Sequence, residues 1–194
     1  MHLARAFFDR DTVTVARSLL GQRLVRVVDG ERLSGLIAET EAYGGPDDEA
    51  SHARRRTPRS AIMYGPPGLA YVYFVYGMYF CLNAVTESDG QPGAVLIRAL
   101  VPQEGIATLR ARRGGASLRE VANGPGKLCL ALGITLALNG VDLTAGSELF
   151  LEEGCEVLPE QVVATPRIGV RGNEVARSRP WRFAWHRTPP DRCV

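Results

Sequence analysis

Residues 71–83 read YVYFVYGMYFCLN, and this run decides how the middle of the chain folds. Tyrosine, valine and phenylalanine favour extended backbone, and Gly77 interrupts them near the centre of the run. The pattern predicts two strands, over 70–76 and 78–86, that meet in a tight reversal at Gly77.

The side chains at this reversal are large and largely apolar. Alternation puts Tyr73 on one strand face and Tyr76 on the other, so both cannot lie in the core. The reversal points Tyr76, Met78 and Tyr79 outward, where large apolar groups are unfavourable unless they meet a partner. A wedge between stacked base pairs is one such use. The run taken alone favours a hydrophobic sheet with tyrosine hydroxyls at its rim, so both interpretations stay open.

Turn and strand signals continue on both sides of this run. Asp29-Gly30 lies between QRLVRVV and LSGLIAE and predicts a hairpin. The expected strands are 22–28, 33–39, 70–76, 78–86, 93–101, 149–151, 156–158 and 182–186, and the expected helices are 11–20, 104–114 and 125–133. Asp11 is a suitable N-cap for the first helix, and Pro125 suits the first turn of the last. The elements predict a single mixed α+β domain over 1–194, in which 44–68 is loop and short helix.

The composition is that of an ordinary soluble domain. The chain has 194 residues, 45% of them hydrophobic, which fits one domain of about 100–200 residues. No apolar run approaches the roughly 20 residues that span a bilayer, and the N-terminus lacks a signal-peptide pattern. No coiled-coil pattern indicates an oligomer. We therefore expect a cytoplasmic monomer without membrane contact.

The four cysteines are widely spaced and form no C-x-x-C pair. This spacing argues against a zinc ribbon or an iron–sulfur cluster. Cys81, Cys129, Cys155 and Cys193 are therefore expected to be reduced, with at least two of them buried.

Arginine dominates the basic residues. Of 23 lysines and arginines, only Lys127 is a lysine, and the formal net charge is +2. Guanidinium groups pair with phosphate and stack on bases, which suits a nucleic-acid partner, but a coding bias toward arginine explains the composition equally well. The clusters 54–59 and 110–113 and the tail 167–192 concentrate these charges, whereas acidic residues gather at 148–160.

Carboxylates and one histidine are candidate reactive groups. Glu41 follows a predicted strand and could activate water, and Glu39 shares its strand face and competes for that role. His52 fits either a catalytic or a structural loop histidine. The acidic run 47–49 could be a solvated turn or a metal-binding patch. Composition and spacing alone predict an enzyme that acts on nucleic acid.

Six segments carry a more specific pattern. They are FFDRDTVTVARSLLGQ at 7–22, IAETEAYGGPDDEASH at 37–52, TPRSAIMYGPPGLAYVYFVYGMYFCLN at 57–83, VLIRAL at 95–100, NGPGKLCLALGI at 123–134 and RIGV at 167–170. In this order they resemble the alkyladenine (3-methyladenine) DNA glycosylase family over nearly the whole chain. The resemblance implies a mixed α/β domain on a curved antiparallel sheet, with the hairpin around Gly77 protruding into the DNA minor groove.

The resemblance implies a monofunctional enzyme that flips damaged purines out of duplex DNA and hydrolyses the N-glycosidic bond. It implies that Glu41 is the general base that deprotonates a water for attack on C1′. Arg98 and the main-chain carbonyl of Ile168 match positions that help to hold this water. No cofactor or metal is implied. The lack of a lysine near these residues agrees with the absence of a Schiff-base lyase step.

The resemblance also implies a pocket for the flipped base. The residues that match its sandwiching and edge-binding positions are Tyr43, His52 and Tyr73. Asn83 matches the residue that disfavours the exocyclic amino group of normal guanine. A purine alkylated at N3 or N7 is cationic, so it should stack well on tyrosine faces.

Other matches imply contacts with the duplex. Tyr76 matches the intercalating side chain that fills the vacated space, with Met78 and Tyr79 beside it in the minor groove. Gly124 and Lys127 match a helix start near a DNA phosphate, which the physics of helix N-termini permits. The implied partner is double-stranded DNA that contains damaged purines.

Two other function classes stay open at this point. A metal-dependent nuclease could bind magnesium through Glu41 and the acidic run 47–49, and a chelator would then abolish its activity. A non-catalytic module could recognise distorted duplex with Tyr76 as a wedge. The sequence does not rank 3-methyladenine, 7-methylguanine, hypoxanthine and ethenoadenine as substrates.

Overall fold

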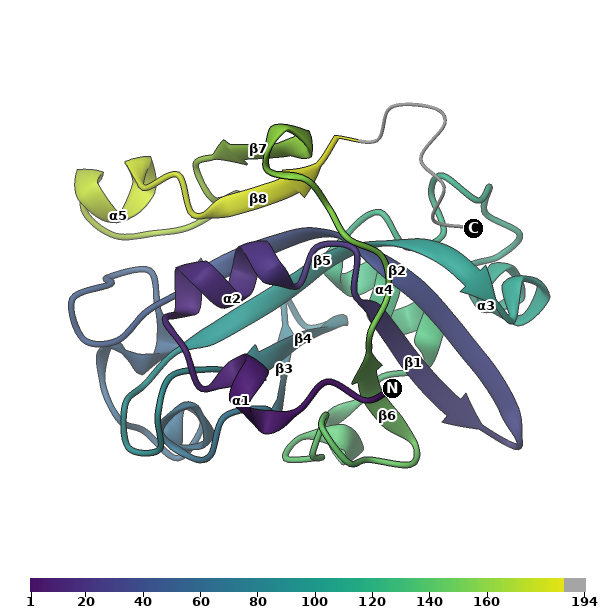
Figure 1. The fold of residues 1–194 in the computed structure, drawn as a ribbon, viewed down its shortest axis with the longest axis horizontal. Coiled ribbons are helices and arrows are strands. Elements are labelled where there is room, and N and C mark those ends of the chain that lie inside the picture. The colour runs from purple at the N-terminus through teal and green to yellow at the C-terminus, as the bar shows by residue number, and fades with distance from the viewer. Residues whose placement is uncertain (187–194) are drawn as a thin grey trace.

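A computed structural model describes residues 1–186 of the chain, and its centre is one antiparallel sheet (Figure 1). The eight strands of the described residues are β1 (Arg23–Val28), β2 (Glu31–Tyr43), β3 (Ala70–Val75), β4 (Tyr79–Val85), β5 (Ala94–Glu104), β6 (Leu149–Glu152), β7 (Val162–Thr165) and β8 (Arg182–Trp185). Their order is β3-β4-β5-β2-β1-β6, and β8 pairs with β2 and β7. The sheet is not closed. Its antiparallel strands, together with the helices, confirm the predicted mixed α+β class on an antiparallel sheet.

The helices are short and lie on both sides of the sheet. They are α1 (Arg5–Phe8), α2 (Thr12–Ser18), α3 (Ile106–Arg112), α4 (Pro125–Leu132) and α5 (Glu174–Ser178), with single 3₁₀ turns at His52–Arg54, Ala61–Tyr64, Leu136–Leu138 and Pro159–Gln161. Figure 1 shows α1 and α2 on the near side of the sheet and α4 behind it. None of the helices of residues 1–186 is long and apolar enough to cross a membrane.

The hairpin β1–β2 forms where its turn chemistry predicts it. Asp29 and Gly30 both have positive φ, of 52° and 78°, and Val28 pairs with Glu31 across the two-residue turn. Such turns match the natural twist of the flanking strands. Strand β2 continues to Tyr43, beyond the predicted end at residue 39. Glu41 therefore lies inside a central strand.

Successive side chains of β2 point to opposite faces of the sheet, and the two faces have different surroundings. Thr40 faces α2, where its hydroxyl donates to the Ala16 carbonyl at 2.8 Å. The Asp11 side chain accepts the Thr14 amide and caps α2, as predicted. Glu39 and Glu41 point to the opposite face because successive side chains alternate.

Two predictions are wrong in the C-terminal third, and one strand there was not predicted. No strand covers 156–158, and a strand forms instead at β7, where Val163 pairs with Ala184 of β8. The Cys155 amide instead donates to the Gly21 carbonyl at 2.9 Å, and Val157 packs against the core. Cys81 and Cys129 are free and buried, as predicted, but Cys155 is disulfide-bonded rather than reduced. Cys193, Arg187 and Arg192 lie outside the described residues.

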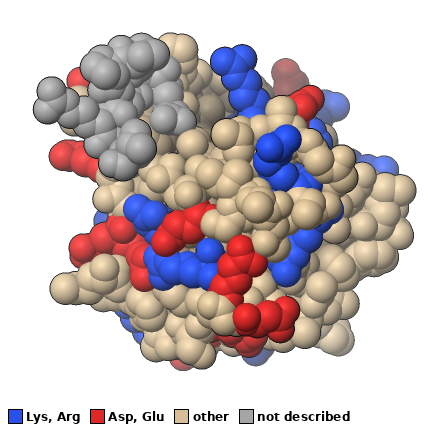
Figure 2. Space-filling model, turned by 90° about the vertical axis from the view of Figure 1, so that its right-hand side faces the viewer, with Lys and Arg blue, Asp and Glu red and all other residues tan. Residues whose placement is uncertain are grey.

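Charges of both signs are mixed on the face at the right-hand side of Figure 1, as Figure 2 shows. Arg32 pairs with Glu104 at 2.9 Å and with Glu152 at 2.5 Å. Arg26 pairs with Glu148 at 3.2 Å. Part of the acidic run 148–160 is therefore balanced by arginines of β1 and β2.

Candidate active site

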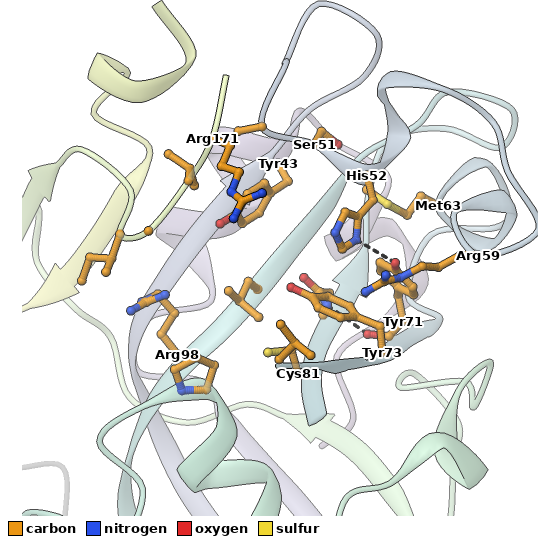
Figure 3. A pocket seen from close by; sticks show the side chains of 18 of the residues that line it. Tyr43, Ser51, His52, Arg59, Met63, Tyr71, Tyr73, Cys81, Arg98 and Arg171 are labelled. Atoms are coloured by element: carbon orange, nitrogen blue, oxygen red, sulfur yellow. Dashed lines mark hydrogen bonds between the residues drawn. The ribbon is translucent and has the colours of Figure 1, made fainter. Parts of the chain in front are cut away.

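A pocket of about 590 Å³ opens between the central strands and the pair β3–β4 (Figure 3). This volume lies within the usual range of small-molecule sites. The predicted site residues that line it are Tyr43, His52, Tyr73, Tyr76, Asn83, Arg98 and Ile168. The structure thus brings together residues that are spread over 126 positions of the chain, from Tyr43 to Ile168.

Glu41 lies directly behind this lining and is fully buried, with 0% exposure. Its Oε1 accepts the Ile168 main-chain N–H at 2.7 Å. Its Oε2 accepts the Tyr43 hydroxyl at 2.8 Å and Arg98 Nη1 at 3.2 Å. A carboxylate oxygen offers two lone pairs, so these contacts fill Oε2 and leave one lone pair on Oε1. All three partners line the pocket.

A second carboxylate stands beside this group. Glu39 Oε1 accepts Arg98 Nε at 2.7 Å and Arg182 Nε at 2.6 Å. Burial alone would raise the pKa of Glu39, but these hydrogen bonds hold it below its ordinary value. Burial alone would lower the pKa of Arg98, but the carboxylates of Glu41 and Glu39 raise it. Both groups are therefore charged at neutral pH.

A buried ion pair holds the loop that carries Ile168. Arg167 binds both carboxylate oxygens of Asp48, at 2.6 and 2.7 Å, and their side chains are 0% and 1% exposed. Arg167 also donates to the main-chain carbonyls of Ala42 and Ala176, both at 2.9 Å. Its guanidinium lies 4.8 Å from the Tyr43 ring centre. Arg167 therefore fixes both Ile168 and Tyr43 next to Glu41.

Sequence reasoning assigned no role to Arg167 and treated Asp48 as part of an acidic patch. The signal available was RIGV, in which an arginine directly precedes Ile168. The Ile168 N–H bonds to Glu41, and the expected contact of its carbonyl with a water stays a prediction.

Aromatic rings form the opposite wall of the pocket (Figure 3). The His52 and Tyr73 ring centres are 4.7 Å apart at 72°, and those of Tyr71 and Tyr73 are 5.3 Å apart. His52 Nδ1 shares a hydrogen bond of 2.8 Å with the Tyr71 hydroxyl. Asn83 Nδ2 donates to the Tyr71 carbonyl at 3.0 Å. Burial raises the pKa of Tyr73, and burial together with Glu41 raises that of Tyr43, so both phenols stay protonated.

His52 is held as a neutral imidazole at the pocket mouth. The surrounding side chains exclude enough water to lower its pKa, and the positive charge of Arg59 lowers it further. Arg59 itself lies 4.8 Å from the Tyr73 ring centre. Figure 3 shows it on the side of Tyr73 away from Tyr43.

The turn between β3 and β4 exposes its side chains. Tyr76 is 81% exposed, Met78 64% and Tyr79 39%, so the predicted outward orientation is confirmed. The Met78 amide donates to the Val75 carbonyl at 3.3 Å and closes the turn. Tyr76 adopts φ +54°, a left-handed conformation that costs about 1–2 kcal/mol for a residue with a side chain.

The start of α4 lies against the same turn. A Cβ added at Gly126 would come within 2.8 Å of the Tyr79 ring, so this glycine lets Tyr79 rest on the helix. Gly124 precedes Pro125, which lines the pocket. Lys127 Nζ donates to Asn123 Oδ1 at 2.8 Å. The two residues predicted to meet phosphate thus lie beside the pocket, at one helix start.

The acidic run 47–49 does not form a metal site in the structure. Across residues 1–186, no group of three or more His, Cys, Asp or Glu side chains could hold a metal ion. Both carboxylate oxygens of Asp48 bind Arg167, and Glu49 accepts the Asn173 amide at 2.7 Å. Three of the four carboxylates of the nuclease interpretation, Glu41, Asp48 and Glu49, are therefore engaged by donors within the chain.

Comparison with known proteins agrees with this geometry. The family model described as "Methylpurine-DNA glycosylase (MPG)" matches residues 6–189. The chain belongs to this family. It is therefore a DNA glycosylase, and its substrate is DNA.

Individual relatives match along almost their whole length. A protein of Methanocella arvoryzae is 51% identical over 194 residues, which cover 99% of this chain and 94% of the relative. Proteins of Bacillus mycoides and Bacillus cereus are 45% and 46% identical over 200 residues, covering 97% of this chain and 98% of each relative. All three bear the name "Putative 3-methyladenine DNA glycosylase". This glycosylase thus shares both its length and its pattern of residues with them.

Proposed function

We propose that this glycosylase removes alkylated and deaminated purines from duplex DNA, with Glu41 as the general base. The observation that carries the proposal is the state of Glu41. It is fully buried, it is held by three donors from the pocket wall, and it retains one lone pair on Oε1. A water that reaches this lone pair is both oriented and activated.

The reaction follows from this arrangement. The water oxygen attacks C1′ as Glu41 takes its proton, and the bond from C1′ to the purine nitrogen breaks with its electron pair leaving on the base. A purine alkylated at N3 or N7 carries a positive charge, so it departs as a neutral molecule and needs no acid. The substrate class of the named relatives, 3-methyladenine, is of this kind.

The aromatic walls supply the binding energy for such a base. Tyr43 on one side and Tyr73 with His52 on the other define a slot for a flat ring. Stacking a cationic purine on tyrosine is worth about 0.5–2 kcal/mol, which a normal purine does not gain. A neutral imidazole at His52 adds no charge repulsion. Asn83, 3% exposed and part of the pocket lining, disfavours the amino group of normal guanine, which gains no stacking energy from a positive charge.

Neutral lesions bind in the same slot, but their release requires protonation of the departing base. Hypoxanthine and ethenoadenine leave poorly unless a proton reaches the departing base, and the phenols of Tyr43 and Tyr73 and neutral His52 in the pocket lining are weak acids. We therefore expect slower release of neutral lesions than of cationic ones.

The exposed turn of β3–β4 completes the proposal. Tyr76 enters the space that the flipped nucleotide vacates, with Met78 and Tyr79 against the minor groove. The start of α4, with Gly124 and Lys127, meets the phosphate backbone. The protein acts as a monomeric single domain in the cytoplasm.

The test is base release from duplexes that carry either 7-methylguanine or hypoxanthine, measured in EDTA. Wild type should release 7-methylguanine, whereas Glu41→Gln, which keeps the shape of the side chain, should be slower by about 10²–10⁴-fold. Equal release by both proteins would show that Glu41 is not the base. Tight binding to damaged duplex without release by wild type would favour a binding module instead.

A further inference from the structure

Glu39 is the carboxylate that the proposed reaction does not use. It shares a strand face with Glu41 but does not line the pocket. Its side chain is 20% exposed, and Oε1 accepts one N–H from each of two arginines. Arg98 comes from β5 and Arg182 from β8, the two strands that pair with β2 at Glu39.

The hydrogen bond between Glu39 and Arg98 determines which edge of the guanidinium group faces Glu41. Arg98 commits Nε to Glu39 at 2.7 Å and presents only Nη1 to Glu41 at 3.2 Å. That contact uses Oε2 of Glu41. Oε1 keeps a single donor, the Ile168 amide. The lone pair available to a water therefore exists because Arg98 is turned away from Oε1.

A guanidinium left without Glu39 prefers a different geometry. Arginine and carboxylate groups favour two parallel hydrogen bonds, and the resulting fork binds both carboxylate oxygens. In that arrangement Nε and an Nη group of Arg98 would cover Oε2 and Oε1 of Glu41. The fork would fill the remaining lone pair on Oε1 and exclude the water.

Charge acts in the same direction. Two carboxylates, Glu39 and Glu41, face two guanidinium groups, Arg98 and Arg182, in a half-buried cluster. Removal of the Glu39 charge leaves two cations for one anion. Both cations would then compete for Glu41 and reduce its ability to accept a proton.

We propose that Glu39 is a positioning residue that holds Arg98 in single contact with Glu41 and so leaves one lone pair of Oε1 without a protein donor, available to the attacking water. This inference rests on the proposed role of Glu41 as the base. It predicts that Glu39 acts only through Arg98, and only on the chemical step.

The principal test is single-turnover release of 7-methylguanine by Glu39→Gln, with binding to the same duplex measured in parallel. The release rate should fall by about 10–100-fold, the range typical of residues that orient a reactive group. The dissociation constant should change by less than about twofold. A wild-type release rate in Glu39→Gln would overturn the proposal.

A double-mutant cycle separates positioning from a general structural role. Arg98→Lys keeps the cation but lacks the fork, so Glu39→Gln added to it should change the release rate by less than about twofold. A full additional loss would show that Glu39 acts independently of Arg98 and would overturn the proposal.

Two further variants serve as controls. Arg182→Gln removes the other partner of Glu39 but leaves the bond to Arg98, so release should stay within about threefold of wild type. A loss as large as that of Glu39→Gln would mean that Glu39 acts only by holding β8 against β2, which would overturn the proposal. Glu104→Gln removes a comparable carboxylate that binds Arg32 Nε at 2.9 Å, and should leave release unchanged. If wild type itself releases no base, the proposed function fails, which is a different result from a fully active Glu39→Gln.

Discussion

Two regions of this protein depart from ordinary burial in opposite directions. Around Glu41, charged groups lie in the interior, with Glu41 at 0% exposure and the side chains of Arg167 and Asp48 at 0% and 1%. At the β3–β4 turn, large side chains lie in solvent, with Tyr76 at 81% and Met78 at 64%. Ordinary domains do the reverse, since charged groups are seldom fully buried unless they are paired.

The difference between the regions lies in their partners. Each buried charge has a partner within the chain, because Arg167 binds Asp48 and Arg98 bridges Glu39 and Glu41. The side chains at the turn tip have no comparable cover, although Tyr79 rests on Gly126. The charged region is therefore complete within the protein, whereas under the proposed function the turn is buried only when DNA binds. Substitutions in the charged region should therefore reduce stability or the rate of base release. Substitutions in the turn should reduce binding to DNA.

The largest effect on stability is expected from Asp48→Asn. This change leaves Arg167 buried without a full counter-charge, which costs about 3–5 kcal/mol when one partner of a buried pair is removed. Urea unfolding should show a lower free energy of unfolding by this amount. The neighbouring Asp47 is exposed, so Asp47→Asn should change it by less than about 0.5 kcal/mol. Equal effects of the two substitutions would contradict the importance of the buried pair.

A smaller effect, confined to binding, is expected from Tyr76→Ser. Loss of the ring should weaken binding to damaged duplex by about 1–3 kcal/mol, the usual value of one aromatic contact with a base. The free energy of unfolding should stay within about 0.5 kcal/mol, because the side chain is exposed. Tyr76→Phe keeps the ring and should bind as wild type does. Weak binding by Tyr76→Phe would mean that the hydroxyl, and not stacking, makes the contact.

The smallest effect is a pH dependence set by His52. Its pKa lies below the ordinary value of 6.5, so the imidazole is half-protonated only below pH 6.5. That proton places a positive charge beside a cationic purine and opposes its binding. The ratio of 7-methylguanine release by wild type to release by His52→Gln should fall to half of its plateau value only below pH 6.5. A ratio that already declines between pH 8 and 7 would show that the pKa is not lowered.

Local signals in the sequence predict the exposed β3–β4 turn far better than the buried charged region around Glu41. Turn residues and alternation specify β1–β2 and β3–β4, because both pairs join neighbouring segments through Asp29-Gly30 and Tyr76-Gly77. The exposure of the turn follows from the same local pattern. The position of β7 was missed, since its pairing with β8 depends on distant residues.

The charged region depends on contacts that no local pattern contains. Arg167 and Asp48 are 119 residues apart, and Glu39 and Arg182 are 143 apart. The resemblance to a glycosylase family indicated Glu41 and Arg98 as site residues. It did not indicate that Glu39 and Arg167 hold their partners in place, because such roles appear only when β5 and β8 lie on either side of β2.

The most direct test of the contrast compares Glu41→Gln and Tyr76→Ser in one experiment. Binding to a 7-methylguanine duplex and single-turnover release under saturating protein are measured for both variants and wild type. We predict that Glu41→Gln binds normally and releases almost no base, and that Tyr76→Ser binds weakly but approaches a higher release rate than Glu41→Gln once saturated. Normal release by Glu41→Gln, or equal loss of binding in both variants, would contradict the division between a buried catalytic region and an exposed binding turn.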